Sequence, residues 1–418
     1  MTKKVLITNI VSLNPGDAAI LLGMKCLVEA KYGKDAELIV YDRNAAAAQK
    51  YYDWCTFKQS LFATPSPNAL ERWFERIGYR HLIERFNFYR LCFAQGLMKR
   101  ELGLLARMFT SKATCEKIDD YLSADLIMCS GGTFLTENYN IQSCLYDFRF
   151  SQHTDAKLGI FPQTLGPFKH PKNVQQLTAS FNDFDLLMVR DQASKTHLTE
   201  IGINEQRIHL VPDAAFCIGH FITLPTRTPN AKDTMRVAVS VRPLKFFEDG
   251  KEELYINSIA QLVTDLVQQK QAEVSFLSTC QGIEEYWSSD DKMADRIVDK
   301  LPADVKSAVR VDRKFRAPLG FLQKCVEFDF IIATRMHAAI MAISCGIPAI
   351  AIAYEFKIAE LYKNLGLQDF YTDIDNNMLQ KLSAAVDKIF TPEFEQDFDA
   401  SRLAITQKSL TALQYMPD

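Results

Sequence analysis

The sequence lacks the features that would point to a membrane span, an exported protein or a nucleic-acid partner. No apolar run approaches the roughly 20 residues that a membrane-spanning helix needs. The first four residues carry two lysines, but the apolar run after them is only as long as a strand, and no signal-peptide cleavage pattern follows. The chain has 48 basic and 51 acidic residues, and its net charge of −3 lacks the excess of positive charge that is typical of nucleic-acid-binding proteins. We therefore expect a cytoplasmic protein that does not bind nucleic acid.

Cysteine and histidine form no recognisable metal or redox motif. The ten cysteines include no CxxC pair and no Cys/His cluster with zinc spacing, and the seven histidines are spread along the chain. Several cysteines lie inside apolar runs, namely Cys26, Cys129, Cys217, Cys325 and Cys345. This placement is typical of reduced core thiols in a cytosolic protein. We expect no metal site.

Common nucleotide-binding and hydrolase signatures are missing as well. No GxGxxG follows the first predicted strand, and neither a P-loop nor a GxSxG elbow occurs. No carboxylate pair suited to glycoside hydrolysis is evident. The sequence therefore does not indicate a dinucleotide site.

The chain instead alternates short apolar runs with helical patterns. Its 418 residues suit two α/β domains of roughly 100–200 residues each. Strands are expected at 4–10, 37–41, 126–129, 158–161, 186–189, 208–211, 235–241, 272–277, 309–311 and 349–353, and in the apolar run at 331–333. This alternation predicts parallel sheets with helices on both faces.

Composition suggests a domain boundary at residues 224–232. This segment, LPTRTPNAK, holds two prolines, two threonines and an asparagine, which makes it the best linker candidate. We expect an N-terminal α/β domain over 1–223 and a C-terminal α/β domain over 233–390. The tail over 391–418 is expected to be a helix that crosses back to the first domain.

One segment departs from the alternation. Residues 70–112 read as a long helical stretch with nine Arg or Lys, four Glu and interleaved aromatic residues, within an insertion of about 70–120. Two interpretations stay open. The insertion is either a helical hairpin whose basic face meets anionic lipid at the inner membrane surface, or a cap whose aromatics pack on the domain while its arginines are solvated. The first is attractive only if the substrate is lipid-linked.

The most informative stretch begins at residue 331. Its apolar run predicts a buried strand that delivers Arg335 and His337 at its carboxyl end, where ligands bind in open α/β sheets. A helix, a Gly-Ile-Pro turn and a second strand follow, with Lys357 just beyond. Arginine offers a fixed fork for phosphate or carboxylate, and histidine can donate a proton near neutral pH.

Two further candidates follow strands of the same predicted domain. Arg242 comes directly after the 235–241 strand, and Ser278 directly after the 272–277 strand. Together with the residues at 335–357, they favour a small, multiply charged anion as ligand. The alternative is a surface arginine and a core histidine that flank a βα turn without a function.

Loops of the first predicted domain supply a second set of candidates at one edge of its sheet. They are Asn14, Gly16, Asp17, Gly131, Gly132, Thr133 and Gln163. Glycine lets the backbone approach sugar hydroxyls or an anion closely. Without a function, Asp17 would serve as a helix N-cap and Gln163 as a loop staple. Arg190 and Asp191 are expected to form an internal ion pair.

These motifs occur in a definite order from about Lys4 to Lys357. They are Asn14-x-Gly16-Asp17, Ser130-Gly131-Gly132, Gln163-x-x-Gly166-Pro167, Val189-Arg190-Asp191, Pro212-Asp213, Arg335-x-His337 and Tyr354-x-x-Lys357. Their order and spacing resemble the polysaccharide pyruvyl transferases, and most of all the colanic acid type. The Asn14-Pro15 turn and the basic insertion depart from the family pattern.

The resemblance implies two Rossmann-like domains with parallel sheets in a GT-B-like arrangement, with the active site in the cleft. The first domain would be the acceptor side and the second the donor side. Phosphoenolpyruvate would be the donor, and a sugar of an exopolysaccharide or cell-surface glycan, free or lipid-linked, the acceptor. The product would be a pyruvate ketal bridging two hydroxyls of one sugar, formed without a cofactor.

The resemblance and the residue types together suggest roles for individual residues. The family's RxH pair falls on Arg335 and His337, which are the expected catalytic residues, with His337 as the acid that protonates the donor. Arg242, Arg335, Lys357 and Ser278 would bind the donor. The seven loop residues of the first domain would bind the acceptor, and Asp17 is the candidate base.

Two other functions remain compatible with the same residues. A glycosyltransferase of this architecture would use a nucleotide sugar and would often hold its ribose with a carboxylate of the second domain, for which Glu355 is the candidate. A non-catalytic glycan-binding scaffold would bind glycan but release no phosphate.

Overall fold

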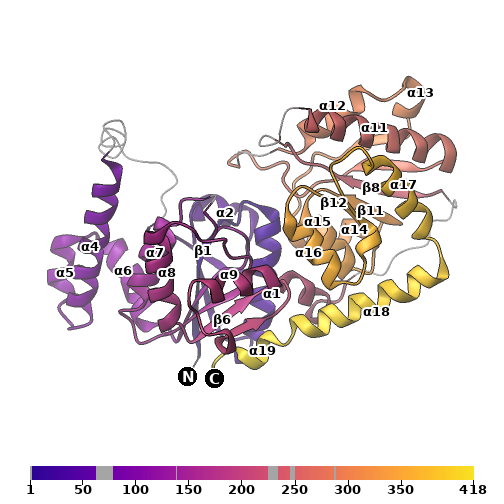
Figure 1. Cartoon of the computed structure of the whole chain (residues 1–418). Helices are drawn as coiled ribbons and strands as arrows, with labels where there is room; N and C mark the ends of the chain where they lie inside the picture. Colours follow the sequence, from indigo (N-terminus) through magenta and orange to yellow (C-terminus); the bar gives the residue numbers. More distant parts are fainter. Residues whose placement is uncertain (1, 63–78, 138, 225–233, 245–249, 287–288) are drawn as a thin grey trace. The chain divides into compact units, whose positions relative to one another are not determined.

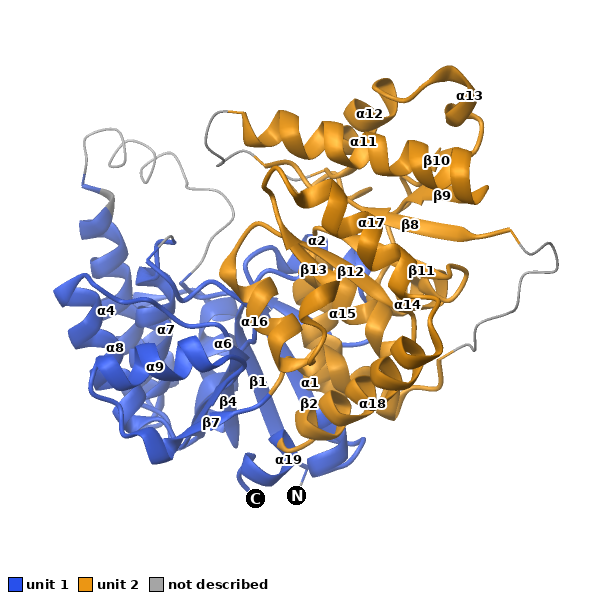
Figure 2. Ribbon diagram, turned by 45° about the vertical axis from the view of Figure 1, so that its right-hand side comes forward, with its two compact units in different colours: residues 1–12, 27–211, 412–418 blue, residues 13–26, 212–411 orange. Residues whose placement is uncertain are grey.

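The chain folds into two units, each built around one parallel β-sheet (Figures 1 and 2). The computed structural model describes residues 2–62, 79–137, 139–224, 234–244, 250–286 and 289–418. Unit 1 consists of Met1–Ser12, Leu27–Val211 and Ala412–Asp418, and unit 2 of Leu13–Cys26 and Pro212–Thr411. The prediction of two α/β domains with parallel sheets is confirmed.

Unit 1 contains a seven-stranded sheet in the order β3-β2-β1-β4-β5-β6-β7, with all neighbours parallel. Its strands are β1 (Lys4–Ile10), β2 (Glu37–Asp42), β3 (Thr56–Gln59), β4 (Leu126–Cys129), β5 (Lys157–Gln163), β6 (Leu186–Val189) and β7 (Ile208–Leu210). The strand order reverses between β1 and β4. Loops after strands diverge at such a switch point, which makes it the usual ligand position in open α/β sheets.

The helices of unit 1 pack around this sheet, and three of them form the predicted insertion. They are α2 (Ala45–Tyr51), α4 (Arg80–Met98), α5 (Gly103–Phe109), α6 (Lys112–Ser123), α7 (Gln142–Ser151), α8 (Pro171–Asp183), α9 (Gln192–Glu200) and α19 (Ala412–Tyr415), while α1 (Pro15–Tyr32) runs through the division between the units. The predicted helical insertion is confirmed from residue 80 onward as α4, α5 and α6. Its first part, residues 70–78, lies outside the described residues.

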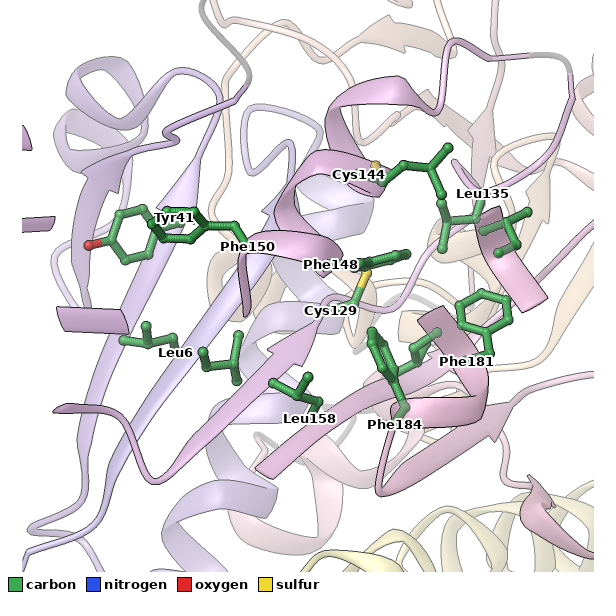
Figure 3. Packing of buried hydrophobic residues seen from close by; sticks show 14 of the residues in the cluster. Leu6, Tyr41, Cys129, Leu135, Cys144, Phe148, Phe150, Leu158, Phe181 and Phe184 are labelled. Atoms are coloured by element: carbon green, nitrogen blue, oxygen red, sulfur yellow. The ribbon is translucent and has the colours of Figure 1, made fainter. Parts of the chain in front are cut away.

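The core of unit 1 is aromatic where α7 and α8 meet the sheet. Phe148 and Phe150 of α7 and Phe181 of α8 are fully or almost fully buried, and the ring of Phe148 meets Phe184 edge-on at 5.2 Å (Figure 3). All residues of β4 are buried as well, because helices cover both faces of a parallel sheet. Each such phenylalanine contributes about 1.5–3 kcal/mol relative to an exposed one.

Unit 2 contains a six-stranded parallel sheet in the order β10-β9-β8-β11-β12-β13. Its strands are β8 (Arg236–Ser240), β9 (Glu273–Phe276), β10 (Val309–Val311), β11 (Phe330–Ala333), β12 (Ala349–Ala353) and β13 (Tyr371–Asp373). Its helices are α10 (Ile218–Phe221), α11 (Lys251–Lys270), α12 (Asp291–Asp299), α13 (Ala303–Lys306), α14 (Pro318–Cys325), α15 (Met336–Ser344), α16 (Phe356–Asn364), α17 (Met378–Lys388) and α18 (Pro392–Ser409). Here the strand order reverses between β8 and β11.

The boundaries of the two units differ from those of the predicted domains. Residues 13–26 and 212–223 group with unit 2, and residues 225–233 of the expected linker lie outside the described residues. The tail divides, since α18 belongs to unit 2 and α19 to unit 1. Within unit 1 the ring of Tyr415 stacks on His209 at 3.9 Å, and the Tyr32 hydroxyl donates to the Pro417 carbonyl.

Within the described ranges, every helix is too short or too polar to cross a bilayer.

Asp120 of α6 ties this helix to three strands of unit 1. Its carboxylate accepts hydrogen bonds from Lys4 of β1 at 2.9 Å, from Tyr41 of β2 at 2.8 Å, and from Lys58 of β3. Burial raises the pKa of Asp120, but the hydrogen bonds from Lys58, Lys4 and Tyr41 outweigh burial and leave the pKa below its ordinary value.

Asp120→Asn is predicted to lower the free energy of unfolding by about 1–3 kcal/mol near pH 7, because two lysines lose a charged partner. Since the folded pKa is depressed, this stability is present above the unfolded pKa of about 3.9 and disappears as pH falls through the folded pKa. Urea unfolding of wild type and variant across this range measures it. Asp119→Asn, an exposed neighbour, is the control. A loss that does not change with pH would contradict the assignment.

Candidate active site

The two arginines predicted to bind an anion lie beside the switch point of unit 2. Arg242 follows β8 and Arg335 follows β11, and these strands pair so that Ala333 is opposite Ser240. Ligands of open α/β sheets bind outside the carboxyl ends of strands at the point where the strand order reverses. The fold therefore places both arginines at the usual ligand-binding edge.

Arg335 is held by a buried carboxylate that the sequence did not reveal. Its Nε and Nη2 donate to the two carboxylate oxygens of Asp290 at 3.0 and 2.5 Å, and the side chains are 12% and 0% exposed. The Cys280 amide also donates to Asp290. Burial raises the pKa of the Asp290 carboxyl, and the charge of Arg335 opposes this shift. Asp290 thus fixes the guanidinium and engages two of its nitrogen atoms.

His337 lies in the first turn of α15 beside a second carboxylate. Its Nε2 is 3.4 Å from Oδ2 of Asp213, whose other oxygen accepts from the Ala215 amide at 3.0 Å. Among the described residues, no group forms a hydrogen bond of good geometry with this buried Nε2. Asp213 is therefore placed to orient the imidazole through its charge.

The start of α1 lies against the other edge of the imidazole. A Cβ atom on Gly16 would lie 2.7 Å from Nδ1 of His337, so no larger residue fits there without displacing the ring. Asn14, and not Asp17, caps α1, because its Oδ1 accepts from the Gly16 amide at 3.0 Å. Asp17 lies within the first turn, where the helix dipole stabilises a carboxylate.

Cys280 connects Asn14, at the start of α1, to the ion pair of Arg335 and Asp290. Its thiol donates to Oδ1 of Asn14 at 3.5 Å, and burial raises its pKa to about 12, so it stays protonated. Asp17 and Asp290 both act electrostatically on this thiol. Asn14, Gly16 and Asp17 therefore belong to the same polar cluster of unit 2 as Arg335 and His337.

Arg242 and Lys357, the other two predicted cations, both lie near the ring of Tyr354. The Arg242 guanidinium lies 4.1 Å from the centre of its ring, and the Lys357 ammonium 5.7 Å from it. Lys357 also forms an ion pair of 2.8 Å with the half-exposed Glu355. Sequence reasoning expected Arg242 and Lys357 in one site and included Tyr354 in a motif, but it did not expect both cations to lie near the tyrosine ring.

Ser278 has its hydroxyl engaged within the fold. The hydroxyl donates to the Val241 carbonyl and accepts from the Val241 amide, each at 2.9 Å. It therefore joins the loop after β9 to the residue that precedes Arg242. Ser278 therefore helps to position that arginine, and its predicted role in donor binding stays a prediction.

The other acceptor-side candidates belong to unit 1. Gln163 is fully buried and donates to the Ser130 carbonyl at 3.2 Å, and it pairs with Gly132 in an isolated bridge beside Gly131. Its Oε1 is buried and finds no partner among the described residues. Gln163 thus staples the loop after β4 to β5.

Arg190 and Asp191 extend this stapled region. Arg190 donates to the hydroxyls of Thr133 and Thr164, and the Thr164 hydroxyl donates to Asp191 at 2.6 Å. The two charged residues are thus linked through Thr164, and Thr133 is held by Arg190.

Asp213 and Asp290 are the functional residues that sequence reasoning missed. Asp213 had a signal, since a Pro-Asp step follows a strand, but nothing marked it as a partner of His337. Asp290 lies in no motif and meets Arg335 only in the fold. No group of three or more metal-ligating side chains occurs among the described residues.

Comparison with known proteins gives three kinds of match. The family model for polysaccharide pyruvyl transferase matches residues 14–355. The amylovoran biosynthesis protein AmsJ of Erwinia amylovora is 25% identical over 292 residues, which cover 65% of this chain and 67% of AmsJ.

The solved structures that resemble the chain share its two-domain GT-B fold. MnaA of S. aureus with UDP has a TM-score of 0.58 at 11% identity, covering 99% of this chain and 94% of its own. The UDP-GlcNAc 2-epimerase of Methanocaldococcus jannaschii has a TM-score of 0.58 at 12% identity, covering 97% and 99%. Anabaena HepE with UDP-glucose has a TM-score of 0.56 at 14% identity, covering 98% and 96%. At these identities the likeness shows the fold alone.

Asp290→Ala is predicted to lower the stability of the protein by about 3–5 kcal/mol, because it leaves Arg335 buried without its carboxylate. Urea unfolding measures the loss. Asp291→Ala is the matched control: its partner Arg313 is exposed, so its loss is about 0–1 kcal/mol. Equal losses in the two variants would refute a special role for the buried pair. Substituting both partners, Asp290→Leu with Arg335→Met, is expected to recover part of the loss.

Proposed function

This chain belongs to the polysaccharide pyruvyl transferase family, and on that premise we propose that it transfers pyruvate from phosphoenolpyruvate to a sugar of an exopolysaccharide or cell-surface glycan. The observation that carries the proposal is the cluster of Arg242, Arg335, His337 and Lys357 at the carboxyl edge of the sheet of unit 2. Three cations and an imidazole in one place suit a donor that carries two anionic groups and must be protonated.

The donor's charges match the side chains around Tyr354. Phosphoenolpyruvate carries a phosphate and a carboxylate, for which the arginine fork is the geometric complement. In our proposal Arg242 and Lys357 bind these groups, and the half-exposed Glu355 yields its ion pair with Lys357 to the incoming anion. Arg335, held by Asp290, contributes positive charge that is already oriented before the donor binds.

Proton transfer is the chemical step that His337 would perform. Protonating the methylene carbon of phosphoenolpyruvate makes C2 electrophilic, and a sugar hydroxyl then forms a C–O bond to C2 and loses its proton. A neighbouring hydroxyl then attacks the same carbon, the bond from C2 to the phosphate oxygen breaks, and the phosphate leaves with the proton of this second hydroxyl. The ketal then bridges two hydroxyls of one sugar, and no oxidant or metal takes part in this balance.

Positioning of His337 in this scheme depends on the groups at its two edges. Asp213 faces Nε2 and Gly16 faces Nδ1, so the ring is confined from both sides. Asp17, in the first turn of α1, is the proposed base for the sugar hydroxyl.

The acceptor is a polysaccharide component in our proposal. The relative AmsJ is named for amylovoran biosynthesis, which supports an exopolysaccharide sugar but not specifically colanic acid. Asn14, Gly16 and Asp17, which lie in the polar cluster of unit 2, are the proposed acceptor-binding residues. For Gly131, Gly132, Thr133 and Gln163 of unit 1, acceptor binding stays a prediction, and the fully buried Gln163 acts there as a staple. A lipid-linked repeat unit and the colanic acid type remain predictions.

His337→Ala is predicted to lower kcat for phosphate release by about 10²–10⁴-fold, because no other acid replaces the imidazole. The variant should still bind phosphoenolpyruvate, since the cations are unchanged, and this is measured as the rise in melting temperature with donor. Turnover at the wild-type rate would exclude His337 as the acid. His209→Ala, which removes a histidine of unit 1, is the control.

Phosphoenolpyruvate is predicted to raise the melting temperature of the wild-type protein by mass action, and Arg242→Gln to reduce this shift strongly. Arg310→Gln, an exposed arginine of β10, should leave the shift intact. UDP-glucose serves as the opposing ligand. Stabilisation by UDP-glucose but not by phosphoenolpyruvate would favour a nucleotide-sugar glycosyltransferase and overturn the proposal.

A further inference from the structure

Exposed apolar side chains of the described residues concentrate on α4 and α5. Of fifteen large hydrophobic residues that are strongly exposed, ten lie between residues 79 and 109. The two most exposed are Leu104 and Met108 of α5, at 79% and 76%. Helix α5 packs against α4, and both contact α6 at the margin of unit 1 (Figure 1). Such a concentration marks an interaction surface.

Helix α4 is apolar on two opposite sides. Phe88, Leu91 and Ala94 are buried toward the unit, as the cap interpretation of this segment expected. The opposite side exposes a stripe at helical spacing: Leu82, Phe86, Tyr89 and Phe93. A solvated surface helix would carry polar residues there.

Helix α5 continues the exposed stripe. The ring of Phe109 meets that of Phe93 edge-on at 4.8 Å, so the exposed residues of the two helices join. We call this surface the α4–α5 face, defined by Leu82, Phe86, Tyr89, Phe93, Leu104, Leu105, Met108 and Phe109.

The helices of the α4–α5 face also carry basic residues. Residues 81–112 contain six Arg or Lys and two Glu, although the whole chain has a net charge of −3. Arg85, Arg100 and Arg107 are exposed, and Arg85 lies over the ring of Tyr89 at 5.7 Å. Positive charge and large apolar side chains thus occur on the same two helices.

We propose that the α4–α5 face binds the surface of a bilayer containing anionic phospholipid. Exposed Phe, Leu and Met would enter the boundary between head groups and acyl chains, and the arginines would pair with lipid phosphates. The helices lie in the interface, since none of those described can span a bilayer. A second copy of the chain fits less well, because a symmetric dimer would bring the same arginines face to face.

Vesicle sedimentation tests the proposal with the full-length protein. We expect binding to vesicles of phosphatidylserine and phosphatidylcholine, little binding to phosphatidylcholine alone, and a loss of binding at high salt. Leu104→Asp/Met108→Asp and Arg100→Glu/Arg107→Glu should each weaken binding at least about tenfold. Leu403→Asp, 54% exposed on α18, and Lys306→Glu/Lys363→Glu, exposed in unit 2, are the matched controls.

Three outcomes would overturn the proposal. One is equal binding to both vesicle types, and another is equal loss in test and control variants. The third is a dimer in solution that Leu104→Asp/Met108→Asp dissociates while vesicles bind nothing, which would assign the face to a second copy. Circular dichroism and melting temperatures establish that the variants fold, and the assay does not depend on pyruvyl transfer.

Discussion

The buried ion pair between Arg335 and Asp290 is the constraint on which the rest of the site depends. Removing both charges from water is costly, and the cost is tolerable only because two hydrogen bonds join them and the Cys280 amide satisfies the carboxylate further. The pair thereby fixes the loop after β9 against the start of α15. His337, two residues from Arg335, takes its position from the same arrangement.

Parallel topology explains why residues far apart in the sequence meet. In the sheet of unit 2, every strand ends at the same edge, so Arg242, Arg335 and Tyr354 follow three adjacent strands, β8, β11 and β12. The reversal of strand order between β8 and β11 places the first two at the switch point. Carboxylates balance the cations before any donor arrives, which makes the site an oriented polar cluster rather than a simple positive patch.

Sequence reasoning succeeded where a local pattern carried the information. The strands at 4–10, 126–129 and 349–353 were predicted with their bounds, because short apolar runs bounded by turn residues identify buried strands. Strands β3 (TFKQ) and β13 (YTD) were missed, since three or four partly polar residues show no periodicity. Asp290 was missed for a different reason: its partner lies 45 residues away, and only tertiary structure joins them. The capping role went to Asn14 rather than Asp17 because the helix begins earlier, at Pro15.

The most direct test of pyruvyl transfer follows the carbon that would become the ketal. Purified protein is incubated with exopolysaccharide repeat units and phosphoenolpyruvate isotopically labelled at C2, and the products are examined by NMR. The account predicts that the label appears as a ketal carbon bonded to two sugar oxygens, with one inorganic phosphate released for each ketal formed. Label that stays in phosphoenolpyruvate, while a nucleotide sugar supplied in parallel transfers its sugar to the same acceptor, would contradict it.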